Sequence, residues 1–280
     1  MKNNYLIGFM QGRIVGSENK NFIQFFPSKK WKDEFKLAKK NDFQNIELTA
    51  NLENLDKNPV FNELLLKNYL FEKRKNKIKA DSLTCDFFMQ KPFFKLDKEN
   101  SLSHKKILEK IIINGQKIGI KKFILPLVDN SSVKNKNQEK KIIEYFTSKN
   151  FKKILLKKTL ILFESNFPPM KLFNFIKKFK SKKFGINYDS GNSAALNYKF
   201  KDETIYFNYV KNIHIKDRHI YGKTVDLGKG NANLYALANY IKRKKYKGNL
   251  ILQTAIPKKR LIQKLISNKK YFNNFLWKKT

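Results

Sequence analysis

The chain has 280 residues, enough for one large domain, and it has no run of about 18 or more apolar residues that could span a membrane. A single cysteine, Cys85, excludes an internal disulfide, and without a secretory signal we expect a cytoplasmic protein. The net charge of +37 is almost entirely lysine, spread over nearly every predicted helix rather than gathered on one face, which argues against a specific nucleic-acid partner.

Short apolar runs alternate with longer amphipathic ones along the whole chain. The short runs fit buried strands and the longer ones repeat their apolar residues at helical spacing. In chain order we predict strand 5–10, helix 29–41, strand 43–48, helix 62–75, strand 78–85, helix 103–119, strand 121–128, helix 137–154, strand 158–165, a helix from 168 to about 180, strand 184–189 with a short helix after it, strand 210–216, helix 233–246, strand 248–255 and helix 258–275.

Each of these eight strands is followed by a helix. Alternating strands and helices imply βαβ units and a parallel sheet, and eight units in this length imply an α/β fold of the (β/α)₈ TIM barrel type, as a single domain over 1–280. A doubly wound open sheet is the alternative, but no glycine-rich phosphate-binding motif follows the first strand.

Ligand-type side chains stand at the ends of four successive predicted strands. These are Glu164 in "LILFES", Asp189 in "GINYD", His214 in "NIHIK" and Gln253 in "LILQTA". The carboxyl ends of barrel strands meet at one mouth, and buried carboxylates need partners. Two carboxylates, an imidazole and an amide oxygen form a ligand set for one divalent ion, which could be Mn²⁺, Mg²⁺, Co²⁺ or Zn²⁺.

Each of these residues also has a purely structural interpretation. A glutamate at a strand end is often the partner of a lysine or arginine, and a single strand histidine is often a core residue with its hydrogen bonds satisfied. The coincidence of four such residues at the same end favours the metal site.

Several motifs together resemble the xylose isomerase-like TIM barrel family of sugar-phosphate isomerases and epimerases. They are "GFMQGRI", "FQNIEL", "LFES", "NYDSGNSAALNY", "HIKDR", "LGKGNAN" and "LILQTA", and they run from residue 6 to about residue 255. The resemblance implies one divalent metal, bound by Glu164, Asp189, His214 and, in the fourth place, Gln253.

The resemblance also implies a sugar or sugar phosphate as the small-molecule partner. We expect Arg13, Glu47, Lys216, Arg218 and Lys229 to contact it at the barrel mouth, with the loop "LGKGN" bringing backbone N–H groups close to a phosphate. Arg13 and Arg218 could instead form salt bridges at the rim of the barrel.

Two positions depart from the family pattern. Family epimerases use two glutamates on opposite faces of the substrate, whereas the second position here is Gln253, which cannot accept a proton. Many members have a histidine three residues after the aspartate of the sixth strand, where this chain has Asn192. We therefore expect isomerisation through an enediolate, with Glu164 as the only base.

Three other functions share this scaffold and remain open as alternatives. They are a keto-polyol dehydratase, which is a lyase, a sugar-binding relative without activity, and a DNA repair endonuclease. The last class uses several metals and many histidines, whereas this chain has three histidines. We expect no membrane partner, and a homodimer stays open.

Overall fold

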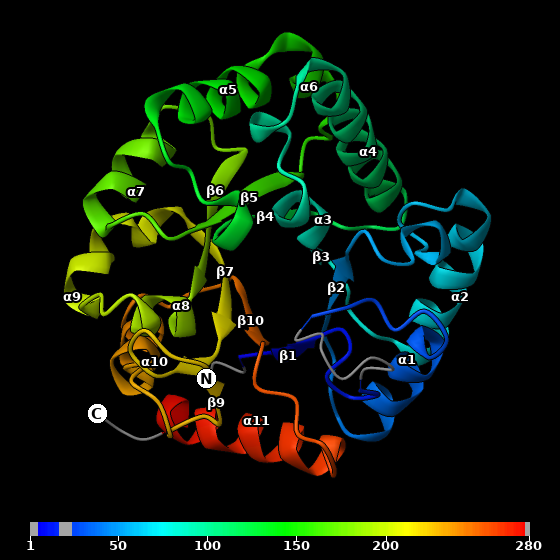
Figure 1. The fold of residues 1–280 in the computed structure, drawn as a ribbon. Coiled ribbons are helices and arrows are strands. Elements are labelled where there is room, and N and C mark those ends of the chain that lie inside the picture. Colours follow the sequence, from blue (N-terminus) through cyan, green and yellow to red (C-terminus); the bar gives the residue numbers. More distant parts are fainter. Residues whose placement is uncertain (1–4, 17–23, 278–280) are drawn as a thin grey trace.

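The computed structural model describes residues 5–16 and 24–277, and in it eight parallel strands close into a barrel. The strands follow one another around the barrel in chain order, and the last closes against the first (Figure 1). They are β1 (Ile7–Met10), β2 (Ile46–Ala50), β3 (Ser82–Cys85), β4 (Lys122–Leu127), β5 (Leu160–Ser165), β6 (Phe184–Asp189), β7 (Val210–Ile215) and β10 (Asn249–Leu252). The predicted TIM barrel is confirmed.

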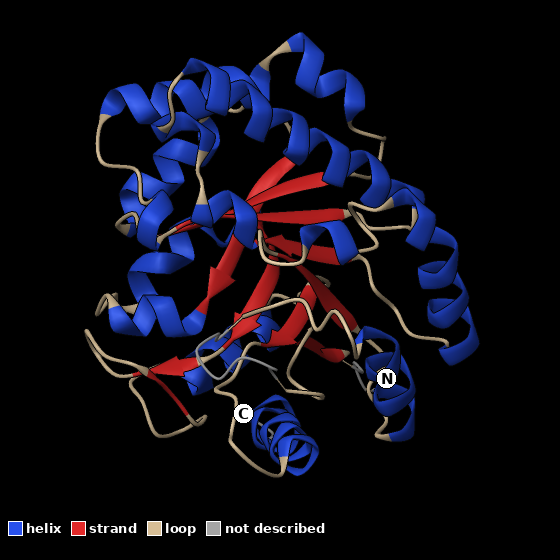
Figure 2. Ribbon diagram, turned by 45° about the vertical axis from the view of Figure 1, so that its right-hand side comes forward, coloured by secondary structure: helices blue, strands red, loops and turns tan. Residues whose placement is uncertain are grey.

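Most of the helices form a ring outside the barrel, as the turned view also shows (Figure 2). The helices are α1 (Trp31–Lys40), α2 (Leu66–Asn76), α3 (Asp86–Gln90), α4 (Lys98–Lys117), α5 (Lys136–Thr147), α6 (Lys149–Ile154), α7 (Pro169–Lys177), α8 (Ser190–Ala195), α9 (Phe200–Glu203), α10 (Leu234–Arg243) and α11 (Leu261–Trp277). Short 3₁₀ turns are η1 (Leu55–Lys57), η2 (Glu63–Leu65), η3 (Phe93–Lys95), η4 (Asp129–Ser131) and η5 (Thr204–Tyr209). Within the described residues, no helix is long and apolar enough to cross a membrane.

Three local features differ from the sequence prediction. The helix predicted over 137–154 is two helices, because the Ser148 hydroxyl accepts the Phe151 N–H and starts α6 as a cap. Helix α3 begins directly after β3, in the segment between the strand predicted at 78–85 and the helix predicted at 103–119. Between β7 and α10 the chain makes a small hairpin of β8 (Asp217–Arg218) and β9 (Thr224–Val225), so β7 is not followed directly by a helix.

An aromatic cluster fills the space between the barrel and the helices on the β4 to β6 side. Phe146 of α5 packs edge-on against Phe151 and Phe163, at centroid distances of 4.8 and 5.4 Å. Phe163 in turn stacks on Phe179 at 5.0 Å. Such pairs add to the free energy gained by burying the rings, so this cluster holds β5, which carries Glu164, against its helices.

A register shift in β6 sets which side chains face the barrel axis. The pairing with β7 shifts between Ile186 and Asn187, so that Asn187 lies opposite Asn212 and Asp189 opposite His214. A bulge of this kind redirects the residues after it. It places the carboxylate at the end of β6 beside the imidazole of β7.

Phe146→Ala should lower the free energy of unfolding by about 3–5 kcal/mol, because it empties a ring site that lies fully inside the cluster. Leu64→Ala is the control, since Leu64 is 86% exposed and its loss should change stability by less than about 0.5 kcal/mol. Urea unfolding followed by circular dichroism measures both. Equal effects of the two substitutions would show that the cluster does not stabilise the barrel.

Candidate metal centre

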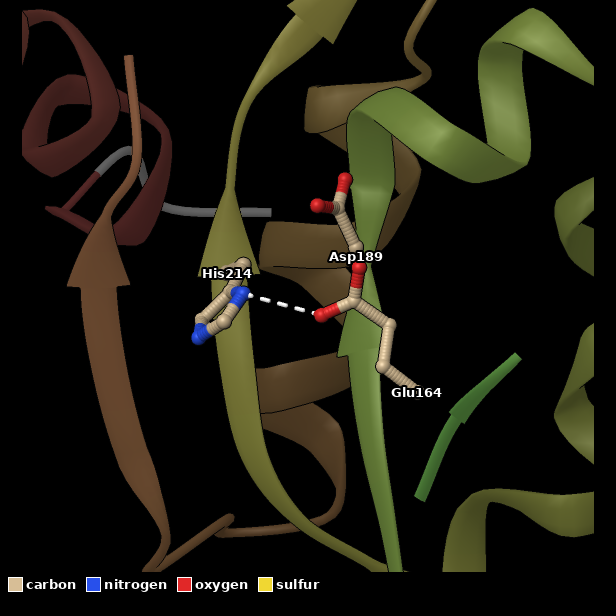
Figure 3. A group of neighbouring side chains, drawn as sticks. All are labelled: Glu164, Asp189 and His214. Carbon is tan, nitrogen blue, oxygen red and sulfur yellow. Dashed lines mark ion pairs between the residues drawn. The ribbon is translucent and has the colours of Figure 1, made fainter. Parts of the chain in front are cut away.

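The three acidic and imidazole ligands predicted from the sequence meet at the carboxyl ends of neighbouring strands. Glu164 on β5, Asp189 on β6 and His214 on β7 each offer one ligand atom, and these atoms lie within 4.8 Å of one another (Figure 3). All three side chains are buried. Their burial means that each charge must be balanced by its neighbours or by a bound cation.

The His214 ring is held by carboxylates on both sides. Its Nε2 lies 2.6 Å from Glu47 Oε1, and its Nδ1 lies 3.3 Å from Glu164 Oε2 and 3.0 Å from Asn187 Nδ2. A proton kept on Nε2 by Glu47 leaves Nδ1 as the atom that faces Glu164 and can accept a cation.

Glu47 lies beneath His214. Its Oε1 also accepts the Thr84 hydroxyl at 2.8 Å, and its Oε2 accepts Asn212 Nδ2 at 2.9 Å. The carboxylate is fully buried. We expected Glu47 to contact substrate, but the structure places it below the imidazole, with both oxygens bonded to protein.

Opposite charges set the protonation of this pair. Burial alone lowers the pKa of His214, but the charge of Glu47 and the hydrogen bonds that the ring donates to Glu164 and Glu47 raise it to about 10. Burial raises the pKa of Glu47, but His214, together with bonds from Ser82 and Thr84, holds it below its usual value. Without a metal, the imidazole therefore carries a second proton that a cation must displace.

Amide groups fix the Glu164 carboxylate. Asn187 Nδ2 donates to Oε2 at 2.7 Å and Asn192 Nδ2 donates to Oε1 at 2.6 Å. Asn192 Oδ1 accepts Arg218 Nη1 at 2.9 Å, while Arg218 Nε and Nη2 donate to the Gly222 carbonyl. Arg218 therefore supports Glu164 through Asn192, and two more of its five N–H donors are used within the hairpin loop.

The predicted fourth ligand, Gln253, is linked to the other ligands by Lys216, which contacts both Gln253 and Asp189. Lys216 Nζ lies 3.3 Å from Gln253 Oε1 and 3.4 Å from Asp189 Oδ2. The amide nitrogen of Gln253 donates to Gln24 Oε1 at 2.7 Å, which turns its oxygen toward the lysine. An ammonium group thus touches two of the four predicted ligands and contributes a positive charge of its own.

The donor set fits a divalent cation. Two carboxylates and a histidine nitrogen converge, a carboxylate orients the histidine from behind, and an amide oxygen turns toward the same place. Lys216 should lower the affinity for the metal, because its ammonium group places a like charge beside the cation.

The glycine loop does not present its amides to a ligand. Gly228 and Gly230 donate to Asp217 Oδ2 at 2.8 and 3.0 Å, and Ala232 donates to Asp217 Oδ1 at 2.9 Å. The structure therefore gives no support to a phosphate contact through these N–H groups, because Asp217 occupies them. Lys229 at its tip is exposed.

Arg13 is at the barrel mouth, as expected, but it is buried rather than at the rim. Its Nε donates to the Thr254 carbonyl at 2.9 Å. Glu34 Oε1 accepts the Gly12 N–H at 2.6 Å and so fixes the turn that carries the arginine; Gly12 has a φ of +88°. Burial raises the pKa of Glu34 to about 8, against the lowering effects of Gly12, Gln11 and Arg13.

Asp86 is an acidic group at this mouth that was not predicted from the sequence. It directly follows β3, as Asp189 closes β6, so the strand-end rule that selected Asp189 would also have selected it. Asn187 was missed too, although it lies two residues before Asp189 on β6, where strand alternation places it on the same inner face.

Comparisons with known proteins identify structures of the same fold and do not assign an activity. No protein-family model and no curated protein matches the sequence. Among solved structures, a xylose isomerase domain protein from Planctomyces limnophilus is 15% identical with a TM-score of 0.73, covering 97% of each chain. The 3-keto-D-glucoside 4-epimerase YcjR from E. coli is 13% identical with a TM-score of 0.71, covering 97% of this chain and 100% of its own. The IolI protein, solved with a zinc atom, is 16% identical with a TM-score of 0.70, covering 96% and 97%.

The chain therefore has the fold of the xylose isomerase-like TIM barrel proteins. The resemblance seen in its motifs is confirmed at the level of the fold, over almost the whole chain.

Manganese loading should give one bound ion per chain in the wild type and much less in His214→Ala, because the variant loses one ligand and unpairs Glu47. His219→Ala is the matched control, since His219 is exposed on the hairpin and should leave binding unchanged. Elemental analysis after gel filtration measures the content. The same metal content in both variants would exclude His214 as a ligand.

Metal affinity should fall as the pH falls from 8 to 6. The pKa of His214 is about 10 without metal, so across this range binding must release the Nδ1 proton, and the apparent affinity should drop by about tenfold per pH unit. Calorimetric titration of Mn²⁺ in buffers of different ionisation enthalpy counts the released proton. Binding without proton release would contradict this protonation state.

Proposed function

We propose that the protein is a divalent-metal-dependent isomerase of a sugar, with Glu164 as the base that moves the proton. The observation that carries the proposal is the convergence of Glu164, Asp189 and His214 within 4.8 Å, at the barrel end where such enzymes place their chemistry. The sugar epimerase among the structures of the same fold supports the substrate class, and the zinc-containing one supports the metal.

Glu164, Asp189, His214 and Gln253 would hold the metal. Bound there, a divalent cation polarises a substrate carbonyl as a Lewis acid and acidifies the neighbouring C–H. Glu47 keeps the His214 ring in the orientation that turns Nδ1 to the site, and Lys216 adds positive charge where negative charge develops on the substrate.

Glu164 is the group suited to accept the C–H proton. Asn187 and Asn192 hold its two oxygens in a fixed orientation, and geometry of this kind determines the efficiency of a general base. A 1,2-shift needs one base on one face of the substrate, because the proton leaves one carbon and returns to its neighbour. Gln253 cannot accept a proton, so the site favours aldose–ketose isomerisation over two-base epimerisation.

We further propose that the sugar is not phosphorylated. The amides of the glycine loop are bound to Asp217, and the guanidinium of Arg218 is engaged by Asn192 and Gly222. The loop amides have no free N–H, and three of the five N–H donors of Arg218 are already used, so these two groups favour a sugar without a phosphate.

A sugar-binding protein without turnover is the second candidate, and the position of Lys216 favours it. Its ammonium already bridges Asp189 and Gln253, so a cation is present in the site without any metal. The two candidates differ in whether the wild type exchanges substrate protons with solvent.

Glu164→Gln should lower the turnover of the metal-loaded enzyme by about 10²–10⁴-fold, because an amide cannot act as a general base. Gln253→Glu should instead bind Mn²⁺ more tightly, since it adds a negative charge at the cation. A panel of aldoses, ketoses and their phosphates, followed by proton NMR in D₂O with Mn²⁺ content measured in parallel, tests both. Wild-type activity in metal-loaded Glu164→Gln would exclude Glu164 as the base, and a metal-loaded wild type that exchanges no sugar proton would favour the binding protein.

A further inference from the structure

Asp86 stands at the barrel mouth and has no part in the metal centre. It is the first residue after β3 and opens α3, which lies close to the barrel strands inside the outer ring of helices (Figure 1). Two residues earlier, Thr84 points into the barrel, where its hydroxyl donates to Glu47. Asp86 lies near the same side chains, since the charges of Glu164, Arg13 and His214 act on its carboxyl group.

The Asp86 carboxyl is buried without a full set of partners. It is 4% exposed, and its Oδ2 has no hydrogen-bond partner in the part of the chain that the structure describes. Buried polar atoms in native proteins are nearly always bonded, and an exception calls for an explanation such as a catalytic role. An oxygen in this position is suited to contact a ligand.

Arg13 shows the same pattern. Its Nε is fixed by the Thr254 carbonyl, but Nη1 and Nη2 are buried and find no partner among residues 5–16 and 24–277. Within those ranges no ion pair joins Arg13 to Asp86, although each influences the pKa of the other. Asp86 therefore offers one carboxyl oxygen and Arg13 offers two NH₂ groups, and none of these is bonded within the described residues.

The electrostatic surroundings favour the protonated form of Asp86. Burial and the negative charge of Glu164 raise its pKa to about 8, against the lowering effect of Arg13, His214 and Lys216. At neutral pH Asp86 is then present beside the metal-centre residues as a carboxylic acid, which can donate a proton. A carboxyl group that burial keeps protonated near neutral pH is the usual form of a general acid.

We propose that Asp86 is a second catalytic residue, a general acid that exchanges protons with the oxygens of the substrate while Glu164 exchanges them with its carbons, and that Arg13 binds the substrate beside it. This inference rests on the isomerase function proposed above. It assigns Asp86 a task that the metal ligands and Gln253 do not perform.

The proton transfers balance over one aldose–ketose conversion. Glu164 takes the proton from C2, the C1–C2 double bond forms, and the carbonyl oxygen on C1 takes the Asp86 proton, which gives a neutral enediol and the Asp86 carboxylate. Asp86 then takes back the proton of the C2 hydroxyl, a carbonyl forms at C2, and Glu164 returns its proton to C1. Both carboxyl groups end as they began.

Asp86→Asn is the primary test, with Asp129→Asn as the matched control. Both remove one carboxylate after neighbouring barrel strands, but Asp129 is exposed in η4. Turnover is measured by proton NMR in D₂O with the sugars that the wild type converts, in the Mn²⁺-loaded enzyme. We expect Asp86→Asn to lower kcat by about 10²–10⁴-fold, with the Mn²⁺ content and the circular dichroism spectrum of the wild type, and Asp129→Asn to leave kcat unchanged.

Chemical rescue separates proton transfer from a structural role. Asp86→Ala leaves room for a small acid, so added formate should restore part of its kcat and leave the wild type unaffected. A folded Asp86→Ala enzyme that formate does not rescue, or an Asp86→Asn enzyme as active as Asp129→Asn, would overturn the role of Asp86 while the isomerase remains. A metal-loaded wild type that exchanges no sugar proton would overturn the isomerase and this role together.

Discussion

The hydrogen bond between Glu47 and His214 is the contact on which the rest of the site depends. It joins β2 to β7 across the barrel and fixes which nitrogen of the imidazole faces Glu164. A ring without this partner could turn or change its tautomer, and Nδ1 would no longer be held toward the other ligands. Removing Glu47 would also leave a buried imidazolium without its nearest negative charge, which is among the costliest changes a protein interior can undergo.

Charge balance around this pair explains the density of polar groups inside the barrel. Glu164 and Asp189 are balanced by His214 and Lys216, and the side-chain amides of Asn187 and Asn192 donate further hydrogen bonds to Glu164. A site built in this way is held together without a bound cation, because each carboxylate has a protein partner. When a metal binds, the ligand side chains must give up these protein partners, which lowers the affinity. The free energy of removing a proton from His214 is also part of the binding free energy.

Much of the architecture follows from the sequence, because local patterns determine it. Buried apolar runs of strand length predicted all eight barrel strands, and the residues closing them predicted that Glu164, Asp189 and His214 would meet. Features that depend on contacts between distant residues were not predictable in the same way. Ser148 caps α6 in a segment whose apolar pattern fits one continuous helix. The glycine loop binds Asp217 only because the hairpin brings the loop back beside that carboxylate. The unbonded oxygen of Asp86 is visible only once the surrounding side chains are in place.

The glycine loop donates three backbone hydrogen bonds to Asp217, and these bonds affect how quickly a ligand can bind. Gly228, Gly230 and Ala232 are tied to one carboxylate in the free protein, so this loop is ordered before any ligand arrives. The entropy of ordering it is lost during folding and does not oppose binding. Association at this edge of the mouth should then proceed without a slow closing step, with a rate set by diffusion and by the positive charge of the surrounding surface.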